Sequence, residues 1–257
     1  MDLQVNRTGA VATVTLSRPE LRNAFNEALI AELTSTFSAL GQDPTLRAIV
    51  LAAEGKAFCA GADLNWMKAM AGYSWEENKA DASKLAEMLW TIYSCPVPVI
   101  ARVQGDVYAG GVGLVSVCDI VVAVESAGFC LSEARLGLLP ATIGPYVVRA
   151  LGEQASRRYF VTAERFSAAE AYRLGLVHEL VTPESLDEKI GVLTASLIAN
   201  GPAAVRACKK LVQDVAHAPI THELRDDTAR RIADIRASDE GRAGVQSFLS
   251  KTPAPWL

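Results

Sequence analysis

Short apolar runs alternate with helical segments along the first two thirds of this chain. Residues 10–16, 47–51, 99–103 and 120–124 are rich in the residue types that favour strands. Turns containing glycine or proline, and not long linkers, separate these runs from the helical segments. The alternation predicts a layered α/β core, because strands and helices bury their apolar faces against one another.

Helices are predicted from apolar spacing and from capping signals. Ser74 with Glu77, and Ser167 with Glu170, have the spacing of a capping box, which predicts a helix start at each place. Residues 23–40 carry apolar side chains at helical spacing, namely Phe25, Leu29, Leu33, Phe37 and Leu40. We therefore expect helices in all three segments.

The pattern becomes wholly helical beyond residue 200. A last strand is expected at residues 176–181, and helices are expected at 203–214 and 223–237, followed by a short tail. We therefore predict a core domain over residues 1–200 and a helical region over residues 201–257.

Charge and hydropathy limit the partners. The chain has 25 basic and 29 acidic residues with no run of five or six like charges, so nucleic acid is not expected as a partner, although an anionic small molecule is allowed. The most apolar stretch, residues 107–124, contains Asp119 and several glycines, so we expect no membrane span. The first residues lack the order of a signal peptide, which favours a cytoplasmic location. A compact monomer of 27.4 kDa would expose roughly 11,000 Å².

Several chemistries lack their residues. The five cysteines form no Cys-x-x-Cys pair and are interpreted as reduced core residues, and the three histidines have no metal-ligand spacing, so no metal is expected. No nucleophile elbow and no phosphate-binding loop of the nucleotide triphosphatases occurs. The glycine loop at 110–113 resembles a dinucleotide fingerprint but lacks its third glycine, so we do not expect NAD.

Two small-residue turns each follow a predicted strand. One spans Lys56–Leu64 and the other is the Gly110–Gly113 loop, which opens a short helix. Free backbone N–H groups in such turns can receive a negative oxygen, and each well-placed donor contributes about 2.7–4 kcal/mol to catalysis. Close packing of a helix on a strand would explain the Gly110–Gly113 loop equally well if it stood alone.

The two turns, with several further motifs, resemble the enoyl-CoA hydratase/isomerase, or crotonase, family. The resemblance covers nearly the whole chain and rests on Arg18-Pro19-Glu20, Ala60-Gly61-Ala62-Asp63, Gly110-Gly111, Pro140 and Gly175-Leu176-Val177. It implies a spiral of ββα turns followed by a C-terminal helical region that mediates trimer formation, the trimers commonly pairing into hexamers. It also implies an acyl-CoA thioester substrate and no separate cofactor.

The resemblance assigns site residues one by one. The two oxyanion donors fall on the N–H groups of Ala62 and Gly110, and one acid–base carboxylate falls on Glu133, for which a surface ion pair with Arg135 is the alternative. The family's second carboxylate falls on Gly113, which has no side chain. Substrate-binding positions are implied at Arg22, Ala24, Ala60, Asp63, Leu64, Gly111 and Ser132, with Lys251 reaching a neighbouring subunit.

The single carboxylate leaves three functions open. The residues in these motifs resemble those of the bacterial branch of methylglutaconyl-CoA and isohexenylglutaconyl-CoA hydratases. This resemblance implies hydration of a branched or carboxylated 2-enoyl-CoA, and we expect Gly113 to leave space for the acyl chain. A lone glutamate also suits an isomerase that moves a double bond between C3 and C2. A catalytically idle CoA-binding scaffold is the third possibility.

Overall fold

The computed structural model describes residues 2–257 and contains two β-sheets. The first sheet has six strands in the order β1 (Leu3–Thr8), β2 (Val11–Leu16), β3 (Ala48–Ala53), β5 (Val99–Val103), β7 (Ile120–Val124) and β10 (Glu179–Val181). In this sheet β1 and β2 pair antiparallel, and the other neighbours pair parallel. The second sheet has the order β4 (Ala57–Cys59), β6 (Asp106–Tyr108), β8 (Gly128–Cys130) and β9 (Arg165–Ser167).

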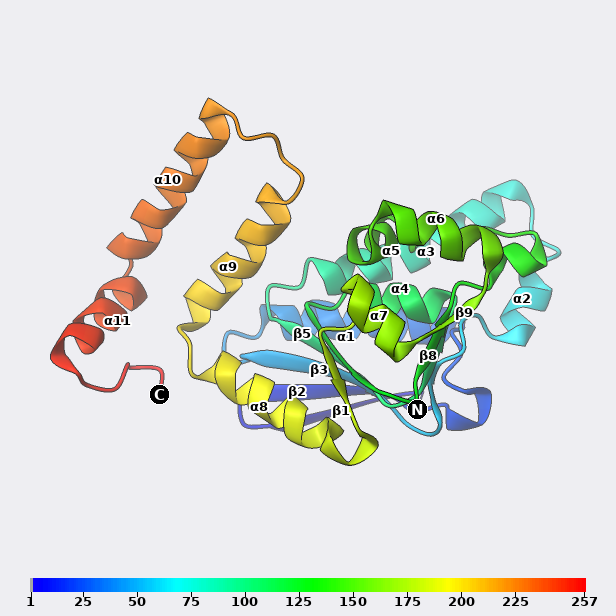
Figure 1. Cartoon of the computed structure of the whole chain (residues 1–257), viewed down its shortest axis with the longest axis horizontal. Coiled ribbons are helices and arrows are strands. Elements are labelled where there is room, and N and C mark those ends of the chain that lie inside the picture. The colour runs from blue at the N-terminus through cyan, green and yellow to red at the C-terminus, as the bar shows by residue number, and fades with distance from the viewer. Residues whose placement is uncertain (1) are drawn as a thin grey trace.

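Helices lie over the sheets and extend beyond them (Figure 1). The helices of the body are α1 (Glu27–Gln42), α2 (Leu64–Met70), α3 (Trp75–Tyr93), α4 (Gly110–Ser116), α5 (Gly144–Leu151), α6 (Glu153–Thr162), α7 (Ala168–Leu174) and α8 (Leu186–Ile198). Three short 3-10 helices are η1 (Pro19–Leu21), η2 (Glu133–Leu136) and η3 (Pro183–Ser185). The C-terminal helices are α9 (Pro202–Val215), α10 (His222–Ala237) and α11 (Asp239–Ser250). The α/β core expected from the sequence is confirmed.

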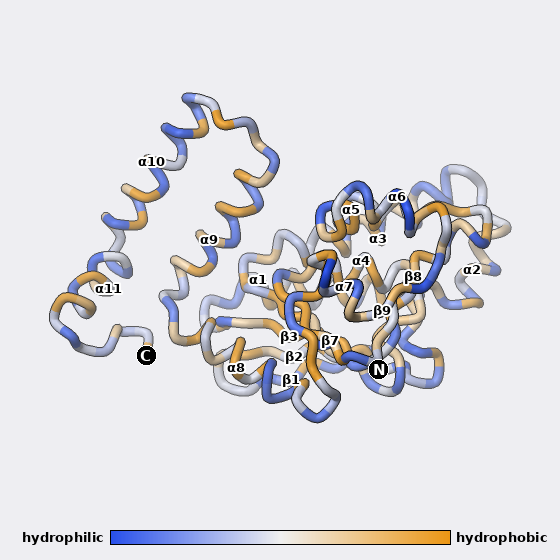
Figure 2. Tube along the Cα trace, viewed as in Figure 1, coloured by the Kyte–Doolittle hydropathy of each residue, from blue (hydrophilic) through white to orange (hydrophobic). Residues whose placement is uncertain are grey.

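The core lies between the sheets and the helices that face them. Strand β3 is buried along its whole length, as expected for a parallel strand covered on both faces. The stripe predicted on α1 is confirmed, since Leu29, Leu33 and Phe37 are each at most 1% exposed. Figure 2 shows apolar segments gathered in the strands and polar segments at the outer loops.

Several expectations about element boundaries and caps differ from the structure, and strand β10 begins at Glu179 and not at 176. Helix α1 begins at Glu27 and not at 23, because Asn26 caps it and Phe25 instead pairs with the turn after β4. The capping box at Ser74 is confirmed in both halves. At Ser167 only half a box forms, because the Glu170 carboxylate binds Arg173 at 2.7 Å. The expected tail after 237 contains the helix α11.

Helices α10 and α11 project away from the body, whereas α9 contacts it through side chains such as Lys209, which donates to Asp119 at 2.6 Å (Figure 1). None of the three helices contains a buried residue. The chain exposes 13,467 Å², well above the roughly 11,000 Å² expected of a compact monomer of this mass. Large apolar side chains on these helices are exposed, including Phe248 at 83%. No single helix within residues 2–257 has the length and hydropathy of a membrane span; η3–α8 and α9 meet that test only as a pair bent by 105°.

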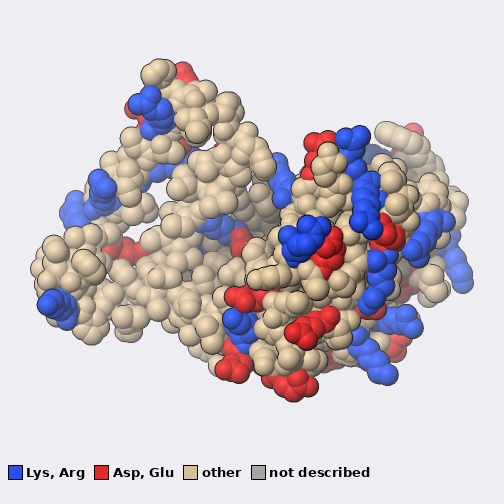
Figure 3. Space-filling model, in the orientation of Figure 1, with Lys and Arg blue, Asp and Glu red and all other residues tan. Residues whose placement is uncertain are grey.

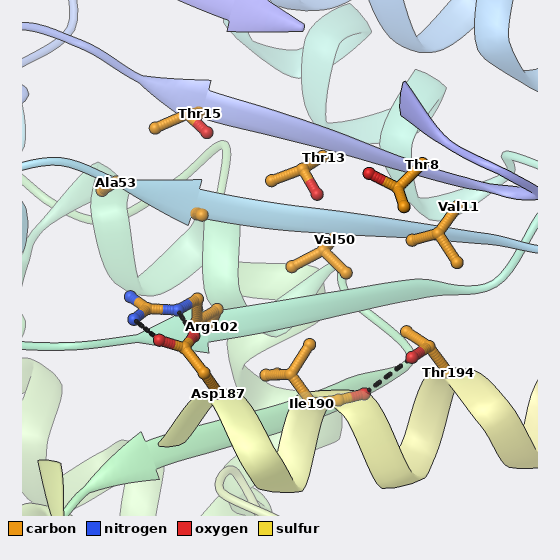
Figure 4. Close-up of a pocket in the computed structure, with 11 residues that line it drawn as sticks. Thr8, Val11, Thr13, Thr15, Val50, Ala53, Arg102, Asp187, Ile190 and Thr194 are labelled. Atoms are coloured by element: carbon orange, nitrogen blue, oxygen red, sulfur yellow. Dashed lines mark hydrogen bonds and ion pairs between the residues drawn. The ribbon is translucent and has the colours of Figure 1, made fainter. Parts of the chain in front are cut away.

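One cavity lies away from the four-stranded sheet, next to the six-stranded sheet. It has a volume of about 480 Å³ and lies between α8 and the face of the six-stranded sheet, with the Arg102–Asp187 ion pair at its edge (Figure 4). Its lining includes none of the residues assigned to the site from the sequence.

On the face of the molecule in Figure 3, basic and acidic side chains are interspersed.

Candidate active site

The carboxyl ends of three neighbouring strands carry the main predicted site residues. Strands β4, β6 and β8 are parallel neighbours, with Cys59 opposite Val107 and Tyr108 opposite Cys130. Parallel strands end at the same edge of a sheet and lie about 4.8 Å apart. The turn with Ala62 follows β4, Gly110 follows β6 and Glu133 follows β8, so the small sheet brings these three residues to one edge.

The turn after β4 leaves the N–H group of Ala62 free. The backbone of Phe25 pairs with both neighbours of Ala62: its N–H donates to the Gly61 carbonyl at 2.7 Å, and its carbonyl accepts from Asp63 at 2.7 Å. The Ala62 N–H itself has no acceptor within residues 2–257. A fixed amide without a partner can donate to a ligand oxygen.

The turn after β6 leaves the N–H group of Gly110 free in the same way. Gly110 begins α4, whose first N–H groups have no partner inside the helix. The preceding residue, Ala109, has φ 47° and ψ −120°, a conformation that costs a non-glycine residue about 1–3 kcal/mol. Its N–H donates to the Cys130 carbonyl at 2.8 Å, which ties the strained turn to β8.

The two turns touch each other. A Cβ on Gly61 would lie 3.0 Å from the Cβ of Ala109 and 3.3 Å from the Tyr108 carbonyl oxygen, and Gly61 has φ 88°, so both the close approach and the backbone conformation favour glycine. A Cβ on Gly110 would lie 3.1 Å from the Phe25 ring. Phe25 therefore supports both turns, Ala62 through its backbone and Gly110 through its ring.

Glu133 presents a carboxylate oxygen with no protein partner. Its Oε2 is buried and accepts no hydrogen bond within residues 2–257. Burial raises the pKa of this carboxyl above its ordinary value, and the Glu133 backbone N–H offsets part of the rise. The alternative ion pair with Arg135 is not formed, because that guanidinium donates to the Ala163 carbonyl. Serine 132 precedes Glu133 and is half-buried.

Asp63 uses its carboxylate inside the protein. One oxygen caps α2 by accepting from the Asn65 N–H at 2.8 Å, and the other accepts from Arg18 at 3.0 Å. Burial opposes ionisation, but these hydrogen bonds outweigh it and hold the pKa of Asp63 below its ordinary value. Asp63 thus orients the turn and has no free oxygen for a ligand, although Leu64 beside it is 74% exposed.

A cleft of about 570 Å³ lies next to the turn after β4. Arg22 and Ala60, both assigned from the sequence, line it together with Lys56 and Tyr108. The Ala60 N–H donates to the Arg22 carbonyl at 2.9 Å, which joins the two assigned residues. Lys56 begins the small-residue segment noted in the sequence but was not predicted to bind a ligand; its place between β3 and β4 was the available signal. The lining also includes Glu20 and Asp106, and Asp106 is paired with Arg165 at 2.7 Å, so Arg22 and Lys56 are the cations of the cleft available to a phosphate-bearing ligand.

The remaining assigned residues are spread more widely. Ala24 is buried, and its carbonyl accepts from Arg18 at 2.7 Å. Gly111 faces β4, because a Cβ there would lie 2.9 Å from the Cβ of Cys59. Lys251 ends α11 on the projecting C-terminal helices, so it does not join the cleft within this chain.

The space expected over Gly113 does not exist. A Cβ on Gly113 would lie 2.1 Å from Cγ2 of Ile143, and Ile143 is 2% exposed. The expectation that an acyl branch fits there is therefore wrong, because this side chain already fills the volume.

Cysteine chemistry is disfavoured beside the site. All five cysteines are free, and burial raises the pKa of the Cys59 thiol to about 12, which keeps it protonated. Cys208, expected in the core, is exposed on α9. Within residues 2–257, no group of three or more His, Cys, Asp or Glu side chains is placed to hold a metal ion.

The chain is similar to known proteins over almost its whole length. Residues 6–257 match the family model described as enoyl-CoA hydratase/isomerase. An enoyl-CoA hydratase structure from Shewanella pealeana is 39% identical, with a TM-score of 0.96 over 100% of this chain and 96% of that one. An enoyl-CoA hydratase structure from Mycobacterium smegmatis is 36% identical, with a TM-score of 0.94 over 100% and 99%. The 2,3-dehydroadipyl-CoA hydratase of Escherichia coli is 30% identical over 97% of this chain and 96% of its own.

Proposed function

Because the chain belongs to the enoyl-CoA hydratase/isomerase family, we propose that it adds water across the C2–C3 double bond of a 2-enoyl-CoA. The observation that carries this proposal is the buried, unpartnered Oε2 of Glu133 at the same sheet edge as two free amides, those of Ala62 and Gly110. An acid–base group and a pair of oxyanion donors are the parts that chemistry beside a thioester carbonyl requires.

The two amides hold the thioester carbonyl oxygen. When a water oxygen bonds to C3, the C2–C3 π electrons move toward the carbonyl and form an enolate, whose oxygen carries the negative charge. Donors fixed in place need no reorganisation as this charge develops, and each contributes about 2.7–4 kcal/mol. Phe25, which braces both turns, keeps the two N–H groups in position.

Glu133 carries both proton transfers. Its carboxylate removes a proton from water as the water oxygen attacks C3, and the resulting carboxylic acid then returns a proton to C2. Burial raises the pKa of Glu133, which makes the carboxylate a stronger base than an exposed glutamate. The buried oxygen without a partner costs stability, which disfavours the idle scaffold, since such a protein would gain nothing from it.

The nucleotide part of CoA is proposed to bind in the cleft lined by Arg22, Lys56 and Ala60. The guanidinium and ammonium groups suit phosphates, and the acyl end then reaches the turn after β4. Exposed apolar side chains lie near the site residues in the chain, namely Leu64 directly after Asp63, and Leu138 and Leu139 shortly after η2. They offer an apolar surface to the acyl chain.

The acyl group is proposed to be branched or carboxylated, as in a methylglutaconyl thioester. The resemblance of the motif residues to the methylglutaconyl-CoA hydratase branch supports this class. The similar 2,3-dehydroadipyl-CoA hydratase is named for a substrate with a second carboxylate. Isomerisation of a 3-enoyl-CoA is the second candidate. The lone carboxylate favours it, because one group that removes a proton from C2 and returns it to C4 completes that reaction.

The absorbance of the conjugated thioester separates these candidates. With crotonyl-CoA and methylglutaconyl-CoA, loss of conjugation reports hydration; with a 3-enoyl-CoA, gain of conjugation reports isomerisation. Glu133→Gln should lower kcat by about 10²–10⁴-fold, whereas Glu188→Gln, an exposed control on α8, should leave kcat unchanged. Activity of Glu133→Gln within tenfold of wild type would remove Glu133 from this role.

The C-terminal helices are proposed to build a trimer of this chain, or a pair of trimers. The exposed apolar side chains on α11 and the large exposed area support this proposal, because such surface is normally covered by a partner. Phe248→Asp should shift light scattering toward a monomer, and Val161→Asp, at an equally exposed apolar site on α6, should not. A trimer that persists in Phe248→Asp would argue against this surface.

A further inference from the structure

Helix α4 passes the site with glycine at three of its first four positions. A Cβ on Gly110 would contact the Phe25 ring, and a Cβ on Gly111 would contact Cys59 of β4. Gly113 lies three residues after Gly110, and residues at this spacing share a helix face. Position 113 is therefore the next position along α4 from which a side chain could project on the side of the Gly110 amide.

The side chain of Ile143 blocks that direction. A Cβ on Gly113 would lie 2.1 Å from Cγ2 and 2.6 Å from Cβ of Ile143, but 3.6 Å from its Cα. The obstacle is thus the side chain and not the backbone. Ile143 is 2% exposed and is the N-cap residue of α5, so it is held between the core and a helix start and has no route to solvent.

We propose that Ile143 is a specificity-determining residue, because it occupies the space into which a side chain at position 113 of α4 would project and so keeps a second acid–base group from that position. This inference rests on the proposed function. With Ile143 in place, this side of the site stays apolar and both proton transfers pass through a single carboxylate. The reaction then depends on one ionisation, and kcat/KM falls only as the pH becomes acidic enough to protonate Glu133.

A thermal series tests the contact without any substrate. Gly113→Ala should lower Tm by roughly 5 °C or more in the wild-type background, because the added Cβ overlaps Ile143. In an Ile143→Gly background the same change should raise Tm by about 2–4 °C, since alanine is the better helix former and the obstacle is gone. Ile143→Ala keeps the Cβ and should relieve only part of the penalty.

Gly191→Ala in α8 is the matched control, because a Cβ there would meet nothing within 4 Å. The effect of Gly191→Ala on Tm should have the same sign whether residue 143 is isoleucine or glycine. If Gly113→Ala also keeps one sign in the Ile, Ala and Gly backgrounds, Ile143 is not the obstacle and the proposal is overturned.

The catalytic part is tested with the double variant G113E/I143G, with G113A/I143G as its control. The new carboxyl should add an alkaline limb to the kcat/KM profile and raise the ratio of hydration to isomerisation at least tenfold over the control. A folded G113E/I143G with the control's profile and ratio overturns the proposal. A wild type without either activity would instead refute the proposed function, and the Tm series would still decide whether Ile143 excludes side chains at 113.

Discussion

Arg18 donates to Oδ2 of Asp63 at 3.0 Å, and both side chains are less than a tenth exposed. The same guanidinium donates to the Ala24 carbonyl at 2.7 Å, so one side chain joins the segment before α1 to the turn that carries Ala62. The Arg18–Asp63 ion pair is structural, but Asp63 directly follows Ala62, whose N–H group is a proposed catalytic donor. Its removal should therefore affect both stability and turnover.

Arg18→Met keeps most of the bulk but leaves the Asp63 carboxylate buried without its partner. We expect a loss of about 3 kcal/mol in the free energy of unfolding, followed by chemical denaturation, and a lower kcat. Because the pKa of Asp63 is held below its ordinary value, the stabilisation is present at neutral pH and is lost as the pH falls through that pKa. The cost of Arg18→Met should shrink in acid. Arg158→Met, in the exposed pair with Glu164, should show little change at any pH.

Glu133→Gln should make the protein more stable while making it less active. Burial raises the pKa of Glu133, so the folded state carries a cost for ionisation at neutral pH. Below the ordinary glutamate pKa, about 4.3, the group is neutral in both states and the cost is absent. Tm scans should show the variant above wild type at pH 7 and the gap closing in acid. A lower Tm for the variant at both pH values would mean that the carboxylate has a stabilising partner.

Phe25→Leu should reduce kcat more than its effect on folding explains. Phe25 and Phe37 are each 1% exposed, so replacing either with leucine should cost a similar, modest amount of stability. Only the Phe25 ring contacts the Gly110 turn, whereas the backbone bonds of Phe25 to the Ala62 turn remain in Phe25→Leu. Steady-state kinetics at a temperature where both variants are folded should show at least a tenfold larger loss of kcat for Phe25→Leu. Equal losses would show that the ring does not position the Gly110 amide.

Arg22→Ala and Lys56→Ala should weaken binding of the thioester without changing its chemistry. Both side chains line the 570 Å³ cleft, so their removal should raise KM roughly three- to tenfold while kcat stays near wild type. Added salt should raise the wild-type KM and reduce the difference between wild type and variants. Lys189→Ala on α8 is the control cation, outside the cleft. A KM unchanged in both cleft variants would place the nucleotide elsewhere.

Local patterns predicted small-residue turns at Ala62 and Gly110, and the resemblance to the family assigned Glu133. None of the short strands β4, β6 and β8, which bring these residues to one edge, was expected from the sequence. The Ser74 capping box was likewise predictable because its partners are three residues apart. The half box at Ser167 was not, because Arg173 competes for the Glu170 carboxylate.

The features that were missed depend on contacts between distant segments. Ile143 lies thirty residues after Gly113, so no local pattern shows that it fills the space. Helix α11 lies where a tail was expected; it contains Gly241 and Gly244, which are poor helix formers. The structure explains Gly244, since a Cβ there would lie 2.7 Å from the ring of Trp256.

The order of strands in the small sheet also determines when during folding activity can arise. Ala62, Gly110 and Glu133 come from segments separated by 48 and 23 residues of chain, and they meet only after β8 has paired with β6 and β6 with β4. Pairings between such distant strands form slowly compared with helices. Recovery of turnover during refolding will therefore lag behind recovery of helical circular dichroism, and the onset of catalysis will mark completion of the fold.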